Sequence, residues 1–366
     1  MFRRRFYRGI IWGIFLLIFE VVAFSQGQKA NGAEPLQKSI AQQKQNLTAQ
    51  EIKERVHVAI NVIRKHCKEL RDIQAAAFAS MKEIDALKEL GLDALPQMCE
   101  VIKDRQDILG LRILLIELVG NLEPKEKTRE TLIYILSDIS DDPLVRMKAV
   151  DWLPQVKNEQ VGLQLVKILQ TEKEPSVRFA IIRAMKYFKV PEIVPVLKDE
   201  FIKGDYLMQI VASHSLATQN TPEAIRFLQS FLQFGFKEKG TNDNLMSEAV
   251  FMHIATALGE AKDASSIPLL KNTLLNYNFS SDIRKTAAQA LGNLGGEESY
   301  SALIESIKKE PDEAVLVYIG KALLTLGNPK GADECLNAAQ KVKDEYVKKE
   351  LESAASGIKS NNLKNK

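Results

Sequence analysis

The chain has 366 residues, of which 45% are hydrophobic and 27% charged, and this is an ordinary composition for a soluble protein. The first twenty residues account for the formal net charge of +3, because four arginines stand there against one glutamate, and the remainder is close to neutral. This balance excludes a strongly basic surface for nucleic acid and gives no preference for an acidic partner. Three cysteines are too few, and odd in number, for a disulfide framework.

The chain opens with arginines and an apolar run, the pattern of a secretory signal peptide. The run from Gly9 to Phe24 is about sixteen residues long, shorter than the roughly twenty residues that span a bilayer, and Glu20 interrupts it. We expect a signal peptide over residues 1–25, cleaved before Gln26 or at a second site at 30–33. The protein is then exported to the periplasm or cell envelope. The alternative is an uncleaved inner-membrane anchor, facing the periplasm.

A polar, Gln-rich segment follows at residues 26–47 and predicts a flexible lead-in. It ends at a capping box, in which Thr48 and Glu51 would satisfy each other's free backbone N–H groups. Apolar residues then recur at helical spacing, and they indicate an N-terminal capping helix: Ile52, Val56, Ile60, Ile63, Cys67 and Leu70.

One short phrase then recurs nine times: a polar helix start, a Val-Arg-like pair, small apolar residues and an Ala-Leu-Gly-like ending. The position of the Arg in the clearest copies anchors each unit, at Ser80, Arg112, Arg146, Arg178, Gln209, Phe251, Arg284, Leu316 and Lys348. Successive anchors lie 31 to 34 residues apart, except for one step of 42. A period in the low thirties is typical of a solenoid built from stacked helical pairs.

Each unit has a first helix that carries the phrase and a second helix whose apolar residues fall at i, i+3, i+4 and i+7. Strand-like alternation is absent, so we predict an all-α fold. Residues 48–358 are expected to form a solenoid of about eight to nine helical hairpins, with capping helices at both ends and a disordered tail at 359–366. Leu165, Leu291 and Leu323 are expected to be buried between neighbouring units.

The Val-Arg pair followed by Ala-x-x-Ala-Leu-Gly resembles the HEAT repeat family, in particular its bacterial branch named after phycobilisome lyases. The resemblance covers roughly residues 70–358 and implies a right-handed superhelix. It also implies that the second helices line the concave side and that the Arg and the preceding acid form a ladder between units. From spacing alone, Arg146 could pair back with Asp142 at i+4 or across to the next unit, and Arg178 with Glu174 likewise.

No catalytic, cofactor or metal signature stands out in the sequence. Cys67, Cys99 and Cys335 lie on apolar helical stripes and are interpreted as buried free thiols, with a Cys67–Cys99 bridge as the alternative. Deoxyhypusine hydroxylase is a HEAT-like enzyme family that binds two irons through His-Glu dipeptides. None of the four histidines here is followed by glutamate, and we expect all to be solvated or packed: His57, His66, His214 and His253.

The one long step contains about ten extra residues at 234–244, after a helix that includes Phe227 and Phe231. Insertions in solenoids become loops on one face, where aromatic residues beside lysines can anchor a partner. The predicted partner-binding residues are therefore Phe234, Phe236, Lys237 and Lys239. In the alternative interpretation the phenylalanines pack under a longer loop.

We therefore expect an exported, non-catalytic scaffold that binds protein partners through its concave second-helix face and the 234–244 loop. No cofactor, metal or nucleic acid is expected, and the membrane is involved only through an uncleaved N-terminal segment. The alternative is a HEAT-like enzyme or cofactor-binding protein of the bilin lyase or hydroxylase type.

Overall fold

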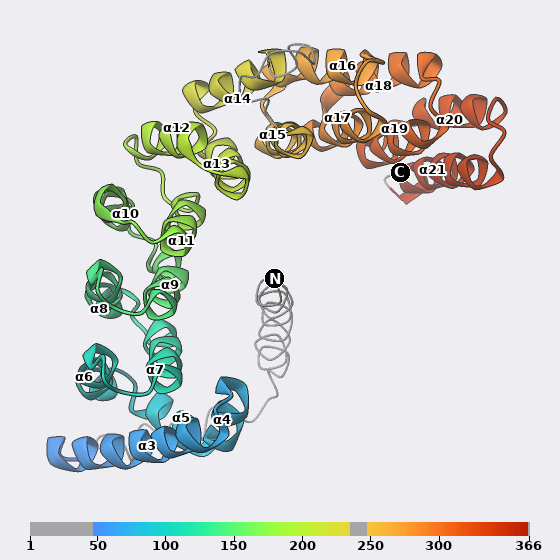
Figure 1. Cartoon of the computed structure of the whole chain (residues 1–366). Helices are drawn as coiled ribbons and strands as arrows, with labels where there is room; N and C mark the ends of the chain where they lie inside the picture. Colours follow the sequence, from blue (N-terminus) through green and yellow to red (C-terminus); the bar gives the residue numbers. More distant parts are fainter. Residues whose placement is uncertain (1–46, 235–246, 365–366) are drawn as a thin grey trace, which may run out of the picture. The chain divides into compact units, whose positions relative to one another are not determined.

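A computed structural model describes residues 47–234 and 247–364, and within these ranges the chain forms helices and turns without a β-strand (Figure 1). The predicted signal peptide and nearly all of the lead-in lie outside the described residues. None of the helices described is both long and apolar enough to span a bilayer. The described part of the chain divides into two compact units, with the boundary between Glu123 and Pro124.

The first unit contains α3 (Ala49–Leu70), α4 (Ile73–Ala79), α5 (Met81–Leu90), a 3₁₀ turn (Gly91–Ala94), α6 (Leu95–Lys103) and α7 (Leu109–Asn121). The predicted capping box is confirmed, because the Thr48 N–H donates to Glu51 Oε2 at 2.7 Å and the Glu51 N–H donates to Thr48 Oγ1 at 3.2 Å. Most of the predicted stripe of α3 is buried, but Leu70 is 45% exposed at the helix end.

The second unit alternates two sets of helices. One set contains α8 (Glu126–Ser137), α10 (Glu159–Thr171), α12 (Ile193–Lys203), α14 (Pro222–Phe234), α16 (Ile267–Leu275), α18 (Gly296–Lys309) and α20 (Gly331–Ala339). The other contains α9 (Pro143–Trp152), α11 (Pro175–Met185), α13 (Tyr206–Gln219), α15 (Glu248–Ala261), α17 (Ser281–Leu294), α19 (Glu313–Leu326) and α21 (Glu345–Lys364). Short 3₁₀ turns at Leu153–Val156 and Ala264–Ser266 join some of them.

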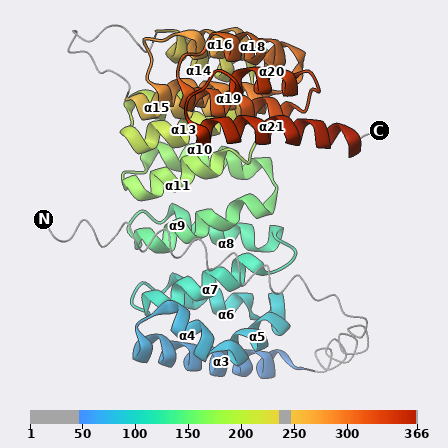
Figure 2. The same ribbon diagram turned by 90° about the vertical axis from the view of Figure 1, so that its right-hand side faces the viewer.

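The phrase helices are α9 to α21 of the second set, and they form one layer of the second unit, while the helices between them form the other (Figure 1 and Figure 2). Neighbouring helical pairs stack in chain order, which confirms the predicted solenoid. The helix bounds add two details. The first anchor, Ser80, falls at the break between α4 and α5, and α21 extends to Lys364, into the segment predicted as a tail.

Within the second unit, the phrase helices line the concave side, and the expectation that the second helices line it is wrong there (Figure 1). The small residues that end the phrase explain this. A Cβ on Gly259 of α15 would lie 2.7 Å from the Ala290 Cα of α17, and one on Gly292 would lie 3.0 Å from the Ala322 Cα of α19. Because these residues let the phrase helices approach closely, their layer is the shorter one and the unit curves around it.

Large apolar side chains between units supply the core. Leu165, Leu291 and Leu323 are fully buried, as predicted. Phe188, Phe201 and Phe251 are also at most 1% exposed. Each helical pair of about thirty residues is too small to bury such a core alone, so its stability depends on its neighbours.

The Arg of the phrase is buried and links one helical pair to the next. Arg146 is 1% exposed, and its Nε donates to the Leu136 carbonyl of the preceding helix at 3.0 Å. Its two terminal nitrogens bind the Glu172 carboxylate, which lies just before the next phrase helix. Arg284 makes the corresponding ion pair with Glu310 at 3.3 Å, but its buried Nε makes no hydrogen bond within the described residues. Spacing left open whether Arg146 pairs with Asp142 or with the next helical pair. The structure shows the pairing with the next helical pair.

The acids that precede the Arg cap their own helices instead. Asp142 Oδ1 accepts from the Leu144 N–H at 2.8 Å at the start of α9, and Glu174 Oε1 accepts from the Ser176 N–H at 3.4 Å at the start of α11. The implied ladder thus exists, but its acid follows the Arg by 26 residues rather than preceding it by four.

Candidate functional site

The predicted partner-binding residues fall almost wholly outside the described residues. Phe234 is the last residue of α14, and nothing is described of its side chain or of Phe236, Lys237 and Lys239. Their role stays a prediction.

The two other phenylalanines of α14 pack inward. Phe227 and Phe231 lie with ring centroids 5.6 and 4.7 Å from that of the buried Phe201 of α12. Their own centroids are 5.0 Å apart, close enough for a favourable edge-to-face arrangement. These two rings therefore stabilise the packing of α14 against α12, and whether they also lie under the 234–244 loop stays a prediction.

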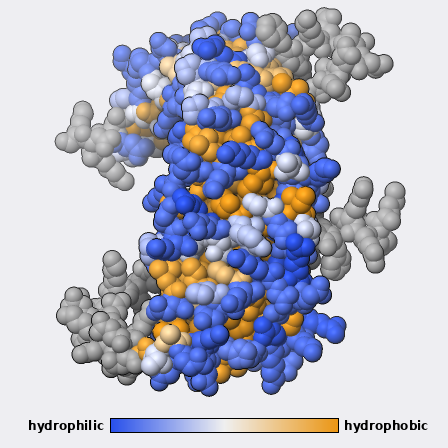
Figure 3. All heavy atoms as spheres, turned by 90° about the vertical axis from the view of Figure 1, so that its left-hand side faces the viewer, coloured by the Kyte–Doolittle hydropathy of each residue, from blue (hydrophilic) through white to orange (hydrophobic). Residues whose placement is uncertain are grey.

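The outer layer of the second unit offers mostly hydrophilic surface. Figure 3 faces the left-hand side of Figure 1 and shows apolar side chains between hydrophilic ones. The large apolar residues exposed here, such as Ile139 and Ile202, are ordinary for a protein surface.

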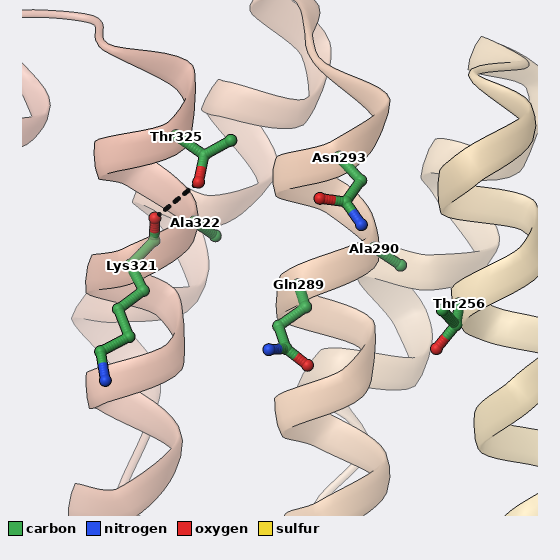
Figure 4. A pocket seen from close by; sticks show the side chains of 7 residues that line it. All are labelled: Thr256, Gln289, Ala290, Asn293, Lys321, Ala322 and Thr325. Atoms are coloured by element: carbon green, nitrogen blue, oxygen red, sulfur yellow. Dashed lines mark hydrogen bonds between the residues drawn. The ribbon is translucent and has the colours of Figure 1, made fainter. Parts of the chain in front are cut away.

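The inner layer, by contrast, contains a polar pocket of about 280 Å³ across three phrase helices. Figure 4 shows the residues that line it, which are Thr256 of α15, Gln289, Ala290 and Asn293 of α17, and Lys321, Ala322 and Thr325 of α19. The two alanines are the same small residues that let the helices approach closely. The packing that curves the unit therefore also makes the floor of the pocket.

The pocket presents neutral hydrogen-bonding groups. Gln289 and Asn293 are exposed, and neither side-chain amide makes a hydrogen bond within the described part of the chain. The Thr256 and Thr325 hydroxyls each donate to a carbonyl of their own helix at 3.0 Å and keep an acceptor free. Lys321 is paired with Glu350 at 2.8 Å. Apart from this ion pair, the lining therefore offers neutral polar groups.

Two histidines meet near this pocket, on the neighbouring phrase helices α13 and α15. His214 Nε2 lies 3.2 Å from His253 Nδ1, and His214 Nδ1 lies 3.2 Å from Glu260 Oε2. His253, Thr256 and Glu260 share one face of α15, because three to four residues complete a helical turn. Burial lowers the pKa of His253, the neighbouring His214 lowers it further, and Glu260 acts in the opposite direction.

Sequence reasoning missed this pair of histidines, because the two residues are 39 positions apart and the long step separates them. One signal was present. His214 lies five residues after its anchor and His253 two after its own, a difference of about one helical turn, which keeps both on the same stripe. Among the residues described, no group of three or more His, Cys, Asp or Glu side chains is arranged to hold a metal ion.

The remaining candidates are structural. The three cysteines are thiols, with Cys67 and Cys335 buried and Cys99 half-buried. Burial raises the pKa of Cys335 to about 12 and also raises that of Cys67, so these two thiols are poor nucleophiles. His57 bonds to Asn61, and His66 bonds to the buried Ser80.

Comparison with known proteins agrees with this architecture. A family model for HEAT repeats matches residues 244–323. Deoxyhypusine hydroxylase from Candida glabrata is 36% identical over 69 residues, which cover 19% of this chain and 21% of that protein. The Saccharomyces cerevisiae protein of the same name is 35% identical over 78 residues, or 21% and 23% of the two chains. The chain therefore spans about a fifth of the length of these curated relatives.

Among solved structures, Kap121p has a TM-score of 0.52 at 16% identity, over 86% of this chain and 39% of that one. At this identity the likeness is one of fold alone. The HEAT-repeat match includes α15, α17 and nearly all of α19, the three helices that line the polar pocket. The chain thus carries HEAT repeats, stacked as an α-solenoid, at its candidate binding surface.

Proposed function

We propose that this chain is a non-catalytic scaffold that binds a polypeptide segment in the polar pocket of α15, α17 and α19. The observation that carries the proposal is the pair of exposed amides, Gln289 and Asn293, set above a floor of alanines on the concave side. Side-chain amides both donate and accept, as the peptide groups of an extended chain do. The charged side chain of the lining, Lys321, is paired with Glu350, so the neutral groups are the main hydrogen-bonding partners offered to a ligand.

The spacing of the amides fits an extended backbone. Gln289 and Asn293 are four residues apart on one helix, which separates them by ~6 Å along its axis. Two residues of an extended chain span ~7 Å. A segment that runs along α17 can therefore present equivalent backbone groups to both amides, with Thr256 and Thr325 on either side.

A random peptide library displayed against the purified chain tests this function. We expect selected peptides whose affinity falls at least tenfold in the double variant Gln289→Ala/Asn293→Ala, because both amides are lost. Ser301→Ala is the matched control, since Ser301 is exposed on α18 in the outer layer. Peptides that bind the double variant as well as the parent would contradict the proposal.

We also propose that the protein works in the periplasm or cell envelope. The support is the arginine-rich start followed by a short apolar run. N-terminal sequencing of the protein from cells distinguishes a chain cut before Gln26 from one anchored by residues 1–25.

A second candidate function is a HEAT-like enzyme or cofactor-binding protein, of the hydroxylase or bilin lyase type. The identity of 36% over 69 residues with a deoxyhypusine hydroxylase favours it. Against it, none of the four histidines is followed by glutamate. Iron analysis and an absorption spectrum of the purified protein decide between the two, since stoichiometric iron or a bound chromophore would support the enzyme.

A further inference from the structure

We propose that His214 and His253 form a binding site for a divalent late first-row transition metal, such as Zn²⁺, Ni²⁺ or Cu²⁺. His214 Nε2 and His253 Nδ1 are the two protein ligands, and Glu260 orients His214. The site does not depend on the polypeptide-binding function proposed above. It shares no residue with the polar pocket.

The facing nitrogens are spaced as two ligands of one ion would be. His214 Nε2 and His253 Nδ1 lie 3.2 Å apart. Two nitrogens that bind Zn²⁺ at about 2.1 Å with tetrahedral geometry are about 3.4 Å apart. The ring centroids are 5.5 Å apart with the planes at 72°, so a small rotation of the rings turns both lone pairs toward a common point.

Glu260 sets the tautomer of His214. Its Oε2 lies 3.2 Å from His214 Nδ1, and a carboxylate there accepts the Nδ1–H. The Nε2 lone pair of His214 then points toward His253. A carboxylate on the far nitrogen of a metal-bound histidine is the usual outer partner of such ligands, and it makes the ring a stronger donor.

The metal takes the place of one hydrogen bond. Without metal, His253 Nδ1–H donates to His214 Nε2. On binding, the proton of His253 moves through solvent from Nδ1 to Nε2, so both rings stay neutral and each keeps one N–H.

The site is accessible from solvent. The His214 side chain is 29% exposed and that of Glu260 is 56% exposed, while His253 is half-buried. Two protein ligands leave further positions on the ion for water. This open arrangement differs from a closed structural metal site, in which four protein ligands surround the ion.

Calorimetric titration of the purified full-length chain with ZnCl₂, NiCl₂ or CuCl₂ alone tests the site. We expect one equivalent of at least one metal to bind, and binding at this site to be lost in His214→Ala and in His253→Ala. Glu260→Gln should weaken it by 10- to 100-fold, as expected for a lost outer-shell carboxylate. His57→Ala is the matched control and should leave it unchanged.

A thermal melt with and without metal provides the second readout, because an ion that binds the folded state alone raises the melting temperature. His253→Gln replaces His253→Ala if the alanine variant does not fold. The proposal is overturned if none of the three metals binds stoichiometrically, or if binding survives the loss of His253. The Gln289→Ala/Asn293→Ala variant should still bind the metal, because it changes only the polar pocket. The result of the metal titration is therefore independent of the result of the peptide experiment.

Discussion

Replacing Arg146 with alanine should destabilise the solenoid more than any surface change, because it leaves a buried carboxylate without its cation. The side chains of Arg146 and Glu172 are 1% and 2% exposed. Removing one partner of a buried ion pair costs about 3 to 5 kcal/mol, mostly through the charge that stays behind. The Leu136 carbonyl also loses its bond from Arg146 Nε.

Urea unfolding followed by circular dichroism measures the effect. The control is Lys203→Ala, which breaks an exposed pair with Asp199 whose side chains are 73% and 53% exposed, and it should cost less than about 1 kcal/mol. The double variant Arg146→Met/Glu172→Gln should recover part of the loss, since neither charge is then buried alone. If Arg146→Ala unfolds at the same urea concentration as the control, the buried arginine does not stabilise the contact between neighbouring helical pairs.

Leu291→Ala should lower the free energy of unfolding by about 2 to 5 kcal/mol, because a fully buried residue leaves a cavity between units; an unchanged melting temperature would show that the site is not packed. Gly292→Val should cost about 1 to 3 kcal/mol through overpacking, since its Cβ would lie 2.9 Å from the Ala322 Cβ, and Gly331→Ala, whose Cβ has 3.6 Å of room, should cost less in the same melt. Burial acts to raise the pKa of Glu172, but the hydrogen bonds from Arg146 and the backbone outweigh it, so its pKa lies below the ordinary 4.5. The stability that this carboxylate contributes is therefore complete above about pH 4.5 and lost as the pH falls through the lowered value, so Glu172→Gln should be less stable than the parent at pH 7 and approach it in acid; a constant difference across that range in urea titrations would refute the assignment.

The fold could be predicted because each unit carries its signals locally. The phrase, its period and the capping box of Thr48 and Glu51 all depend on residues close in sequence. Which layer lies inside the curve could not be predicted in the same way, because both sets of helices have one apolar face. The distance between neighbouring phrase helices decides it, and this distance depends on contacts such as Gly259 with Ala290, 31 residues apart.

The candidate binding surface was harder to predict for the same reason. Gln289 and Asn293 look like ordinary exposed helix residues until Ala290 and Ala322 are seen to form a floor beneath them. The partner of Arg146 was left open by spacing, since an acid four residues before it and one 26 residues after it satisfy the same charge.

Site-specific photo-crosslinking in cells tests the polypeptide-binding pocket most directly. A photoreactive amino acid is placed at position 289 or 293 on the concave side, and at position 301 on the outer layer as the control. We predict a discrete protein adduct from the first two positions and none from the third. Adducts of equal yield from all three positions, or from position 301 alone, would contradict the assignment of the concave side as the binding surface.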